Sequence, residues 1–364
     1  MLRKLLVALA MLTPFVSDQA IADDPVFTAK ATALVGRYLE TDRFSGAVLV
    51  ALDGKPLFRQ GFGFADRAQR IPNAPDTKFR IGSITKPFTS VAVLQLVERG
   101  RLGLDDPLSR HYARTPPAWS KITIRHLLSQ QTGIPSLSDT PGFWETWIKT
   151  HRTPEEGIDL IRNAPLRFAP GSKYEYSNTN HHLLGLVIEA VTGQSYEAYM
   201  QENVFAPLGM RDTGLDHNDK ALTKRALGYE VENGLWKDEN YVSMTIPYAA
   251  GSLYSTIDDL VKWNRALDSN QLIGAASRSQ MFADPGTGYG FGWRVGNWFG
   301  NRVQSHSGGI QGFAALMCRY PDEKLTVVVL ANLRQTPTAW LANELASLHL
   351  GVFGTLTHLC LYEP

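Results

Sequence analysis

Hydrophobic residues recur at two different spacings along this chain, and each spacing predicts a different element. From Phe27 to Glu40 they follow a helical period. The next segment, SGAVLVALDGKPLFRQGFGFAD, contains two β-rich runs that meet at Asp53-Gly54. This dipeptide favours a tight turn, because both of its residues tolerate positive φ. We therefore expect a helix followed by a β-hairpin.

Helical spacing dominates the middle of the chain. The segment YSNTNHHLLGLVIEAVTG predicts an apolar helix that ends at Gly193. The segment ITIRHLLSQQTGIPS predicts a shorter helix that begins at Thr123 and is ended by Gly133. Later, Ser255-Thr256 precedes IDDLVKWNRAL and predicts a capped helix with acidic residues in its first turn.

Strand patterns return in YGFGWRV, NRVQSHSG, GFAALMCRY and KLTVVVLAN, before a final helix that begins near Pro337. Strands at both ends and helices between them predict an α+β fold. Its antiparallel sheet combines N- and C-terminal segments, flanked by helices, and a mostly helical domain is inserted. We expect the first part of the sheet domain at residues 23–75, the helical domain at 76–254 and the second part at 255–364. A cleft between the two parts is the expected place for a site.

The first 22 residues have the pattern of a secretion signal. Arg3 and Lys4 precede an apolar stretch from Leu5 to Val16, and Ala20-Ile21-Ala22 matches an A-x-A cleavage site. We therefore expect cleavage near Ala22 and an exported protein, periplasmic or secreted.

Composition excludes several classes of partner. The net charge is only +1, with 44% hydrophobic and 20% charged residues. The charge therefore gives no electrostatic reason to expect binding to nucleic acid or, through a polybasic segment, to a membrane surface. The apolar C-terminal tail is too short and too interrupted to form a stable membrane span. Cys318 and Cys360 are the only cysteines. One disulfide between them is compatible with export, but we expect two unpaired thiols.

The segment FRIGSITKPFTSVAVLQLVERG places candidate chemistry at the start of a helix. Pro87 is tolerated only in a first turn, so this helix begins no earlier than about Ser83 and runs to Gly100. Lys86 follows Ser83 on the same face, and this is the only S-x-x-K in the chain. A hydroxyl beside an amine at an N–H-rich helix end suits nucleophilic chemistry. By itself the stretch is more typical of a serine N-cap followed by a surface lysine.

Two further motifs lie far along the chain. Tyr176-Ser177-Asn178 is the only Y-x-N, and it falls in a turn before a helix, where a tyrosine either projects from the loop or packs beneath it. His306-Ser307-Gly308-Gly309 lies between two strand-like runs. Its paired glycines allow a ligand to approach the backbone, although a histidine there is also typical of a sheet edge.

The order S-x-x-K, Y-x-N, H-x-G resembles the serine β-lactamase and penicillin-binding-protein family, above all its branch of class C β-lactamases, D-alanyl-D-alanine carboxypeptidases and related esterases. The supporting phrases are FRIGSITKPFTS, LLSQQTGIPS, PGSKYEYSN, AAGSLYSTIDDLVKW, YGFGW and HSGGIQGF, and they extend from roughly Phe44 to Asn332.

This resemblance implies a role for each motif residue. Ser83 attacks an acyl carbonyl and forms an acyl-enzyme, while Lys86 and Tyr176 remove its proton and later help to activate water. Whether Lys86 or Tyr176 is the base stays open. Asn178 holds the amide side chain of the substrate and orients Lys86. The resemblance also places His306 among the catalytic residues, with Ser83, Lys86 and Tyr176.

The resemblance also implies a backbone site for the acyl oxygen. The N–H groups of Ser83 and Gly309 form the oxyanion hole, and Gly308 is glycine because substrate packs against its strand. The β-lactamases of the family usually carry lysine where His306 stands. Because histidine is largely neutral at pH 7, a substrate carboxylate is attracted less, as in certain carboxypeptidases, D-amino-acid peptidases and esterases of the family.

The resulting prediction is an exported serine hydrolase that needs no cofactor. Its expected substrates are D-Ala-D-Ala-type or other peptidoglycan-type peptides and related amides, then small esters, then β-lactams. A carboxylesterase and a penicillin sensor that stays acylated are the alternatives. The elbow G-x-S-x-G of α/β-hydrolases is absent, and His181-His182 point in different directions on a helix, so we expect no metal. Residues 139–151 and 216–240 are expected to shape the pocket.

Overall fold

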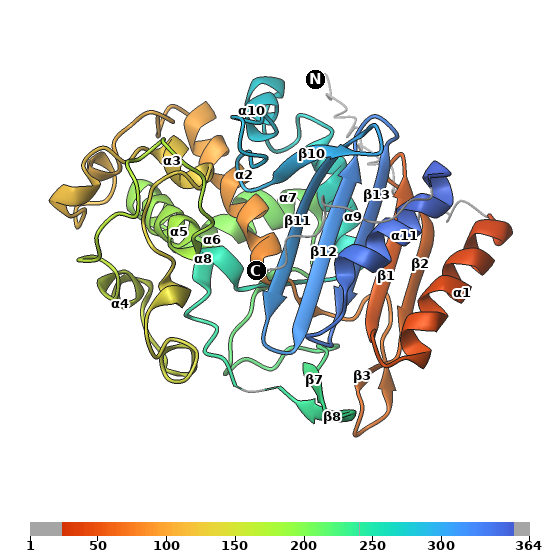
Figure 1. The fold of residues 1–364 in the computed structure, drawn as a ribbon. Helices are drawn as coiled ribbons and strands as arrows, with labels where there is room; N and C mark the ends of the chain where they lie inside the picture. Colours follow the sequence, from red (N-terminus) through yellow and green to blue (C-terminus); the bar gives the residue numbers. More distant parts are fainter. Residues whose placement is uncertain (1–23, 240, 353–364) are drawn as a thin grey trace, which may run out of the picture.

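The computed structural model describes residues 24–239 and 241–352. Its centre is a six-stranded antiparallel sheet in the order β10-β11-β12-β13-β1-β2, with helices on both faces and a larger helical region to one side (Figure 1). The strands of this sheet are β1 (Gly46–Leu52), β2 (Lys55–Phe62), β10 (Arg294–Trp298), β11 (Asn301–Ile310), β12 (Phe313–Tyr320) and β13 (Leu325–Ala331).

Three smaller sheets lie outside the central one, in the pairings β3-β4, β5-β9-β6 and β7-β8. Their strands are β3 (Phe64–Asp66), β4 (Ile71–Pro72), β5 (Phe79–Arg80), β6 (Gly214–Leu215), β7 (Tyr229–Glu232), β8 (Leu235–Asp238) and β9 (Leu253–Ser255). The strand β5 leads directly into the turn that carries Ser83.

The two halves of the sequence meet in the middle of the central sheet. Strand β1 pairs on one side with β2, through the predicted turn at Asp53-Gly54, and on the other side with β13, from Gly46 opposite Ala331 to Leu52 opposite Leu325. Both turn residues have positive φ, 49° and 69°. This pairing confirms the predicted α+β architecture, in which N- and C-terminal segments share one sheet.

The period of two along these strands produces two hydrophobic cores. Val48 and Val327 face the outer core, together with α1 (Pro25–Glu40) and α11 (Thr338–Leu350). Leu49 and Val328 face the inner core, with α2 (Thr85–Glu98) and α9 (Ile257–Leu267). Every residue of β13 is buried, because both of its faces are covered.

The helices agree closely with the helical patterns in the sequence. The predicted caps at Thr123 and Thr256 are present, each accepting a hydrogen bond from the backbone three residues on. The short helix ends at Leu128, before the predicted stop at Gly133, because Gln130 already adopts a left-handed φ of 61°. The remaining helices are α3 (Ile124–Leu128), α4 (Pro154–Asp159), α5 (Asn178–Thr192), α6 (Tyr196–Met200), α7 (Ala206–Leu208), α8 (Tyr248–Gly251) and α10 (Ala275–Met281).

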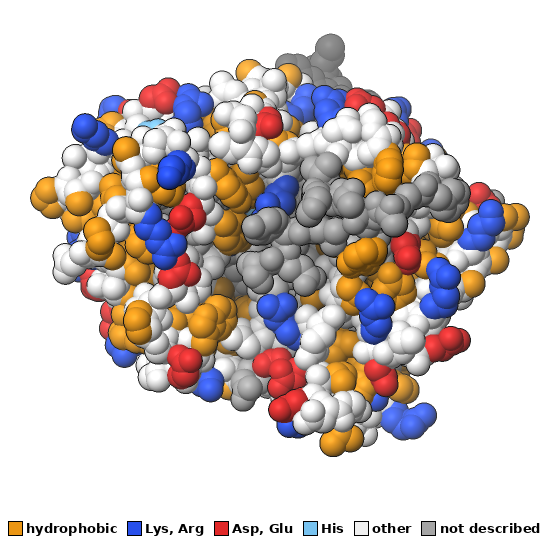
Figure 2. Space-filling model, in the orientation of Figure 1, with side chains coloured by type: hydrophobic (Ala, Val, Ile, Leu, Met, Phe, Trp, Pro, Cys, Tyr) orange, Lys and Arg blue, Asp and Glu red, His pale blue; other side chains and the backbone are white. Residues whose placement is uncertain are grey.

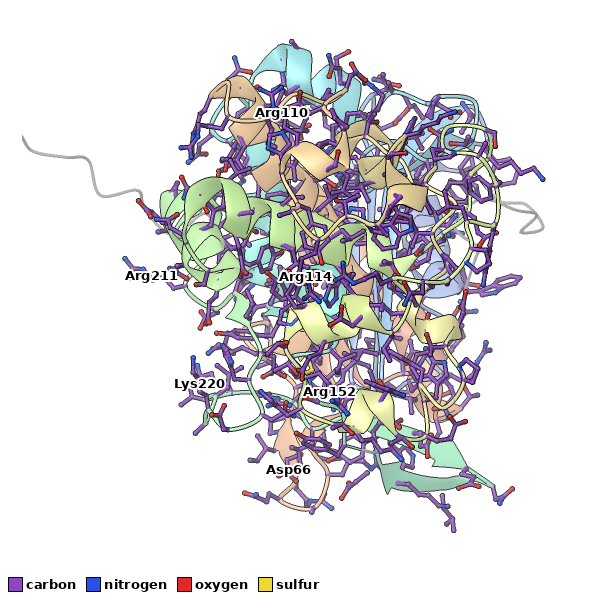
Figure 3. The ribbon with its side chains drawn as sticks, turned by 90° about the vertical axis from the view of Figure 1, so that its left-hand side faces the viewer. Asp66, Arg110, Arg114, Arg152, Arg211 and Lys220 are labelled. Carbon is purple, nitrogen blue, oxygen red and sulfur yellow. The ribbon has the colours of Figure 1, made fainter. Side chains whose placement is uncertain are left out.

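The helical region is fastened at its surface by ion pairs. Seen from that side (Figure 3), Arg114 lies near the middle of the region. Its guanidinium binds Glu155 and Asp159 at 2.8 and 2.9 Å and so holds α4 against the preceding loop. Such exposed pairs each contribute at most about 1 kcal/mol.

Several predictions fall wholly or partly outside this part of the chain. The predicted signal segment and Cys360 lie outside the described residues, so cleavage near Ala22 and the state of the two thiols stay predictions. Cys318 is buried in β12. Within residues 24–239 and 241–352, none of the helices combines the length and apolar character that crossing a bilayer requires. Figure 2 shows acidic and basic side chains interspersed over the face seen in Figure 1.

Candidate active site

The turn that carries Ser83 is held between β5 and α2. Residues Gly82–Ile84 form one 3-10 turn, and α2 begins at Thr85, so that Pro87 occupies its first turn as predicted. Gly82 has φ of 50°, a conformation that glycine adopts without strain. The hydroxyl of Thr85 donates to the carbonyl of Gly82 at 2.7 Å and closes the turn. Ser83 therefore lies at the mouth of α2, where free N–H groups gather.

Lys86 is fully buried, yet its amine has three oxygen partners. Nζ lies 2.9 Å from Ser83 Oγ, 2.8 Å from Asn178 Oδ1 and 2.9 Å from the carbonyl oxygen of Ala250. A neutral amine has two N–H groups and one lone pair, which match two carbonyl acceptors and one hydroxyl donor. Burial holds the pKa of Lys86 well below its ordinary value of 10.5, in agreement with this pairing.

Asn178 and Tyr176 reach Lys86 from the start of α5. Asn178 is the first residue of that helix, and its backbone N–H donates to Ser136 Oγ at 3.1 Å, which fixes the side chain beside Lys86. The ring of Tyr176 lies 4.8 Å from Lys86 Nζ. Burial raises the pKa of Tyr176, while a hydrogen bond with Ser83 opposes the shift, so the phenol stays protonated at neutral pH.

His306 is buried next to the rings of Tyr176 and Tyr289. It is 2% exposed, and its Nδ1–H donates to the carbonyl of Ser307 at 2.6 Å. That bond leaves Nε2 as an acceptor, and the hydroxyl of Tyr289 donates to it at 3.0 Å. Burial lowers the pKa of His306 to about 3, so the imidazole is neutral. Both nitrogens are thus occupied by protein groups, and the ring contacts Tyr176 at a centroid distance of 6.3 Å.

The predicted reason for glycine at position 308 is wrong. A Cβ at Gly308 would lie only 1.9 Å from the carbonyl oxygen of Ile81 and 3.1 Å from the nitrogen of Ser83. Gly308 is therefore required because β11 approaches the Ser83 turn, and the space beside it holds backbone rather than substrate. Gly309 is exposed, and a Cβ at Gly82 would lie 2.9 Å from its nitrogen, so the Gly309 peptide borders the turn.

Replacing Gly308 by alanine will push β11 away from the Ser83 turn. We expect kcat/KM on an aryl ester to fall by roughly 10²-fold, since a displacement near 1 Å has that order of effect, and the free energy of unfolding in urea to fall by about 1–3 kcal/mol. Gly36→Ala is the control, because nothing lies within 4 Å of its Cβ position in α1. Full activity in the Gly308→Ala variant would contradict the steric role.

A cavity of about 410 Å³ opens beside Ser83 and Asn178. Phe143, Trp144 and Ile148 lie on its wall, within the predicted pocket segment 139–151. Glu230 and Glu239 also line it and fall within the second predicted segment, 216–240. Both segments therefore contribute to the pocket as predicted. The rest of the lining is mostly apolar and comprises Gly82, Leu137, Ser138, His182, Ile246, Pro247, Ala250, Gly251, Gly309, Ile310, Gln311 and Arg334.

The neighbouring histidines of α5 have separate partners. His181 contacts Ser90 and Gln130 through its two nitrogens, at 3.2 and 3.3 Å. His182 donates from Nε2 to the carbonyl of Pro154 at 2.8 Å. Across the described residues, no set of three or more His, Cys, Asp or Glu side chains is arranged to bind a metal ion.

Sequence reasoning missed two groups that complete the site. The carbonyl of Ala250 binds Lys86, and the hydroxyl of Tyr289 binds His306. Ala250 lies in AAGSLYSTIDDLVKW, where only the family resemblance marks it. Tyr289 begins YGFGW, which the strand pattern assigns to β-structure, whereas the strand starts only at Arg294.

Comparison with known proteins agrees with this fold. The family model described as Beta-lactamase matches residues 31–350. Penicillin-binding protein 4* of Bacillus subtilis is 31% identical over 317 residues, which cover 80% of this chain and 69% of that protein. The penicillin binding protein of Bacillus halodurans has a TM-score of 0.77 and 30% identity, over 89% of this chain and 99% of its own.

A D-stereospecific amidohydrolase from a Streptomyces species has a TM-score of 0.73 and 26% identity, over 90% of this chain and 99% of its own. The fold and site thus define a protein of the serine β-lactamase and penicillin-binding-protein class, whose members are serine hydrolases that act on amides or esters. This chain belongs to the beta-lactamase family.

Proposed function

We propose that this protein is an exported serine hydrolase that works through an acyl-enzyme on Ser83. One observation carries the proposal: Lys86 Nζ lies 2.9 Å from Ser83 Oγ, while two carbonyl oxygens, of Asn178 and Ala250, take its N–H groups. This arrangement leaves the amine lone pair for the serine proton. Because burial keeps the pKa of Lys86 low and that of Tyr176 high, the amine is the base and the phenol relays a proton.

The reaction has two halves. In the first, Ser83 Oγ bonds to the acyl carbon and its proton passes to Lys86; the carbon–leaving-group bond then breaks and the leaving group takes that proton, by way of the Tyr176 hydroxyl. In the second, Lys86 accepts a proton from water, the resulting hydroxide attacks the ester, and Oγ is released with the proton. The N–H groups of Ser83 and Gly309 stabilise the oxyanion in both halves, each worth roughly 10²- to 10³-fold in rate.

The substrate class follows from the cavity and the relatives. D-Ala-D-Ala-type peptides and related amides come first, since the relatives include penicillin-binding proteins and a D-stereospecific amidohydrolase. The apolar cavity wall of Phe143, Ile148 and Ile246 favours a second candidate, a carboxylesterase for small hydrophobic acyl groups. β-Lactams come last, because the neutral His306 offers no cation to their carboxylate.

Intact-mass analysis after exposure to an aryl ester, a D-Ala-D-Ala peptide and a β-lactam tests the function. We expect one adduct per chain, on the peptide that contains Ser83, which disappears within seconds to minutes for the ester or the peptide. A β-lactam adduct that persists, without turnover of the other two reagents, supports the alternative of a penicillin sensor. Turnover without any adduct on Ser83 contradicts the proposed mechanism.

A further inference from the structure

A second cavity lies between α10 and the strands β10, β11 and β12 of the central sheet (Figure 1). Its volume is about 580 Å³, larger than the 410 Å³ of the cavity beside Ser83, and no residue lines both cavities. Three arginines from three different elements line it, namely Arg278 of α10, Arg302 of β11 and Arg319 of β12. We call this cavity the arginine groove.

Arg319 is the buried cation of the arginine groove, with a side chain that is only 3% exposed. Its Nε donates to Asn264 Oδ1 at 2.6 Å, its Nη1 donates to Gln304 Oε1 at 2.8 Å, and its Nη2 donates to Asp268. A guanidinium has five N–H groups. These bonds therefore leave one N–H on each Nη without a partner among the described residues. Because buried donors of a charged group are costly to leave unpaired, the two N–H groups favour an acceptor in the groove.

Arg278 brings a second guanidinium to the groove. Its Nη1 donates to two neutral oxygens, the carbonyl of Ser269 at 2.5 Å and Oδ1 of Asn270 at 3.0 Å, and within residues 24–239 and 241–352 it forms no ion pair. Burial lowers the pKa of Arg319, Asp268 opposes this shift, and the positive charge of Arg278 adds to the lowering. Both guanidiniums remain protonated, so they repel each other. An anion that contacts both relieves this repulsion.

Two carboxylates line the groove, and neither forms an ion pair with Arg278. Asp268 pairs with Arg319. Asp284 Oδ1 accepts three backbone N–H groups of its own loop, each at 2.8 Å. The exposed Arg302 already has a carboxylate partner outside the groove. The charge that is left without compensation is therefore positive, lies at Arg278 and favours an anionic ligand.

We propose that the arginine groove is a binding site for a phosphomonoester of a small molecule, whose phosphate is held by Arg278 and Arg319. A phosphate offers three strong acceptor oxygens and up to two negative charges, enough for both guanidiniums, whereas one guanidinium is sufficient for a carboxylate. The half-buried ring of Phe282, whose centroid lies 5.4 Å from Arg319 Cζ, provides an apolar wall for the group attached to the phosphate. A volume of about 580 Å³ is in the range of small-molecule sites.

Isothermal titration of the whole chain with glucose 1-phosphate, inorganic phosphate and acetate, at constant ionic strength, tests the inference. We expect one-to-one binding of glucose 1-phosphate, weaker binding of inorganic phosphate and no binding of acetate. Arg278→Gln is expected to raise the Kd of glucose 1-phosphate about tenfold, because it removes charge-assisted donors. Arg278→Lys, which keeps the charge but not the planar fork, is expected to lie between Arg278→Gln and the unaltered protein. Arg37→Gln removes an exposed charge on α1 and serves as control.

Two further measurements check where the ligand binds. Ser83→Ala protein is expected to bind glucose 1-phosphate with an unchanged Kd, since no residue lines both cavities. Backbone hydrogen exchange at residues 275–284 and 302–304 is expected to slow when the ligand is added. The urea midpoints of the Arg278 variants separate a loss of binding from a loss of folding.

Four results overturn the inference. The first is no saturable binding of either phosphate compound, and the second is acetate binding as tight as that of inorganic phosphate. The third is an equal effect of Arg278→Gln and Arg37→Gln, which indicates attraction to the charge of the whole protein. The fourth is weaker binding to Ser83→Ala protein, which places the ligand in the catalytic cavity. The acyl-enzyme mechanism is independent of this groove and is tested separately by the adduct on Ser83.

Discussion

The Ser83→Ala variant will form no covalent adduct, and its kcat on an aryl ester will fall by on the order of 10⁴- to 10⁶-fold. Ser83 Oγ lies 2.9 Å from Lys86 Nζ, and among the described residues no other serine side chain forms a hydrogen bond with that amine. The methyl group of alanine occupies the same space without a nucleophilic atom. Stopped-flow measurement of the product burst, followed by intact-mass analysis, checks the loss.

The fold is expected to be unaffected by this change. Ser83 is only partly buried, and the turn is closed by Thr85 and Gly82 rather than by the serine side chain. The urea midpoint of Ser83→Ala should therefore match that of the unaltered protein. Ser120→Ala, at an exposed position outside the cavity, is the matched control for removal of one hydroxyl. A burst that survives in Ser83→Ala but not in Ser120→Ala refutes the assignment of the nucleophile.

Replacing Lys86 by methionine is expected to slow acylation by on the order of 10²- to 10⁴-fold, the usual contribution of a positioned general base. Methionine fills a similar volume but accepts no proton. Lys86→Arg should be as slow, because a guanidinium does not deprotonate. Single-turnover acylation rates of both variants provide the measurement. Near-normal acylation in Lys86→Arg would show that a fixed positive charge, and not a base, is what the site needs.

The pH dependence of acylation separates these roles further. In the proposed mechanism the neutral form of Lys86 is the active one, and burial holds the pKa of Lys86 well below 10.5. The rate is therefore full above that lowered pKa and is lost as pH falls through it. We expect this acidic limb in the unaltered protein and its absence in Lys86→Met. If the unaltered protein and Lys86→Met show the same acidic limb, that limb reports the titration of a group other than Lys86.

The chemistry of the site was more accessible to sequence reasoning than its electrostatics. Pro87 restricts where the helix can begin, and this local rule is enough to place Ser83 and Lys86 on one turn of the chain. The state of His306 depends instead on Tyr289, which approaches from a bend before β10. Similarly, the steric need for Gly308 arises from Ile81, more than two hundred residues earlier in the chain. Contacts of this kind are fixed by tertiary packing and leave no local pattern.

The pairing of Gly46 with Ala331 also bears on when this molecule can fold. The central sheet cannot form until nearly the whole polypeptide has left the ribosome, because β1 pairs with β13, the last strand in the sequence. Pairing between strands that are far apart in the sequence slows folding and so prolongs the time that the chain stays unfolded. For a protein exported as proposed, a nascent chain that stays unfolded for this long is a suitable cargo for a translocation channel, and its nucleophile becomes active only on the far side.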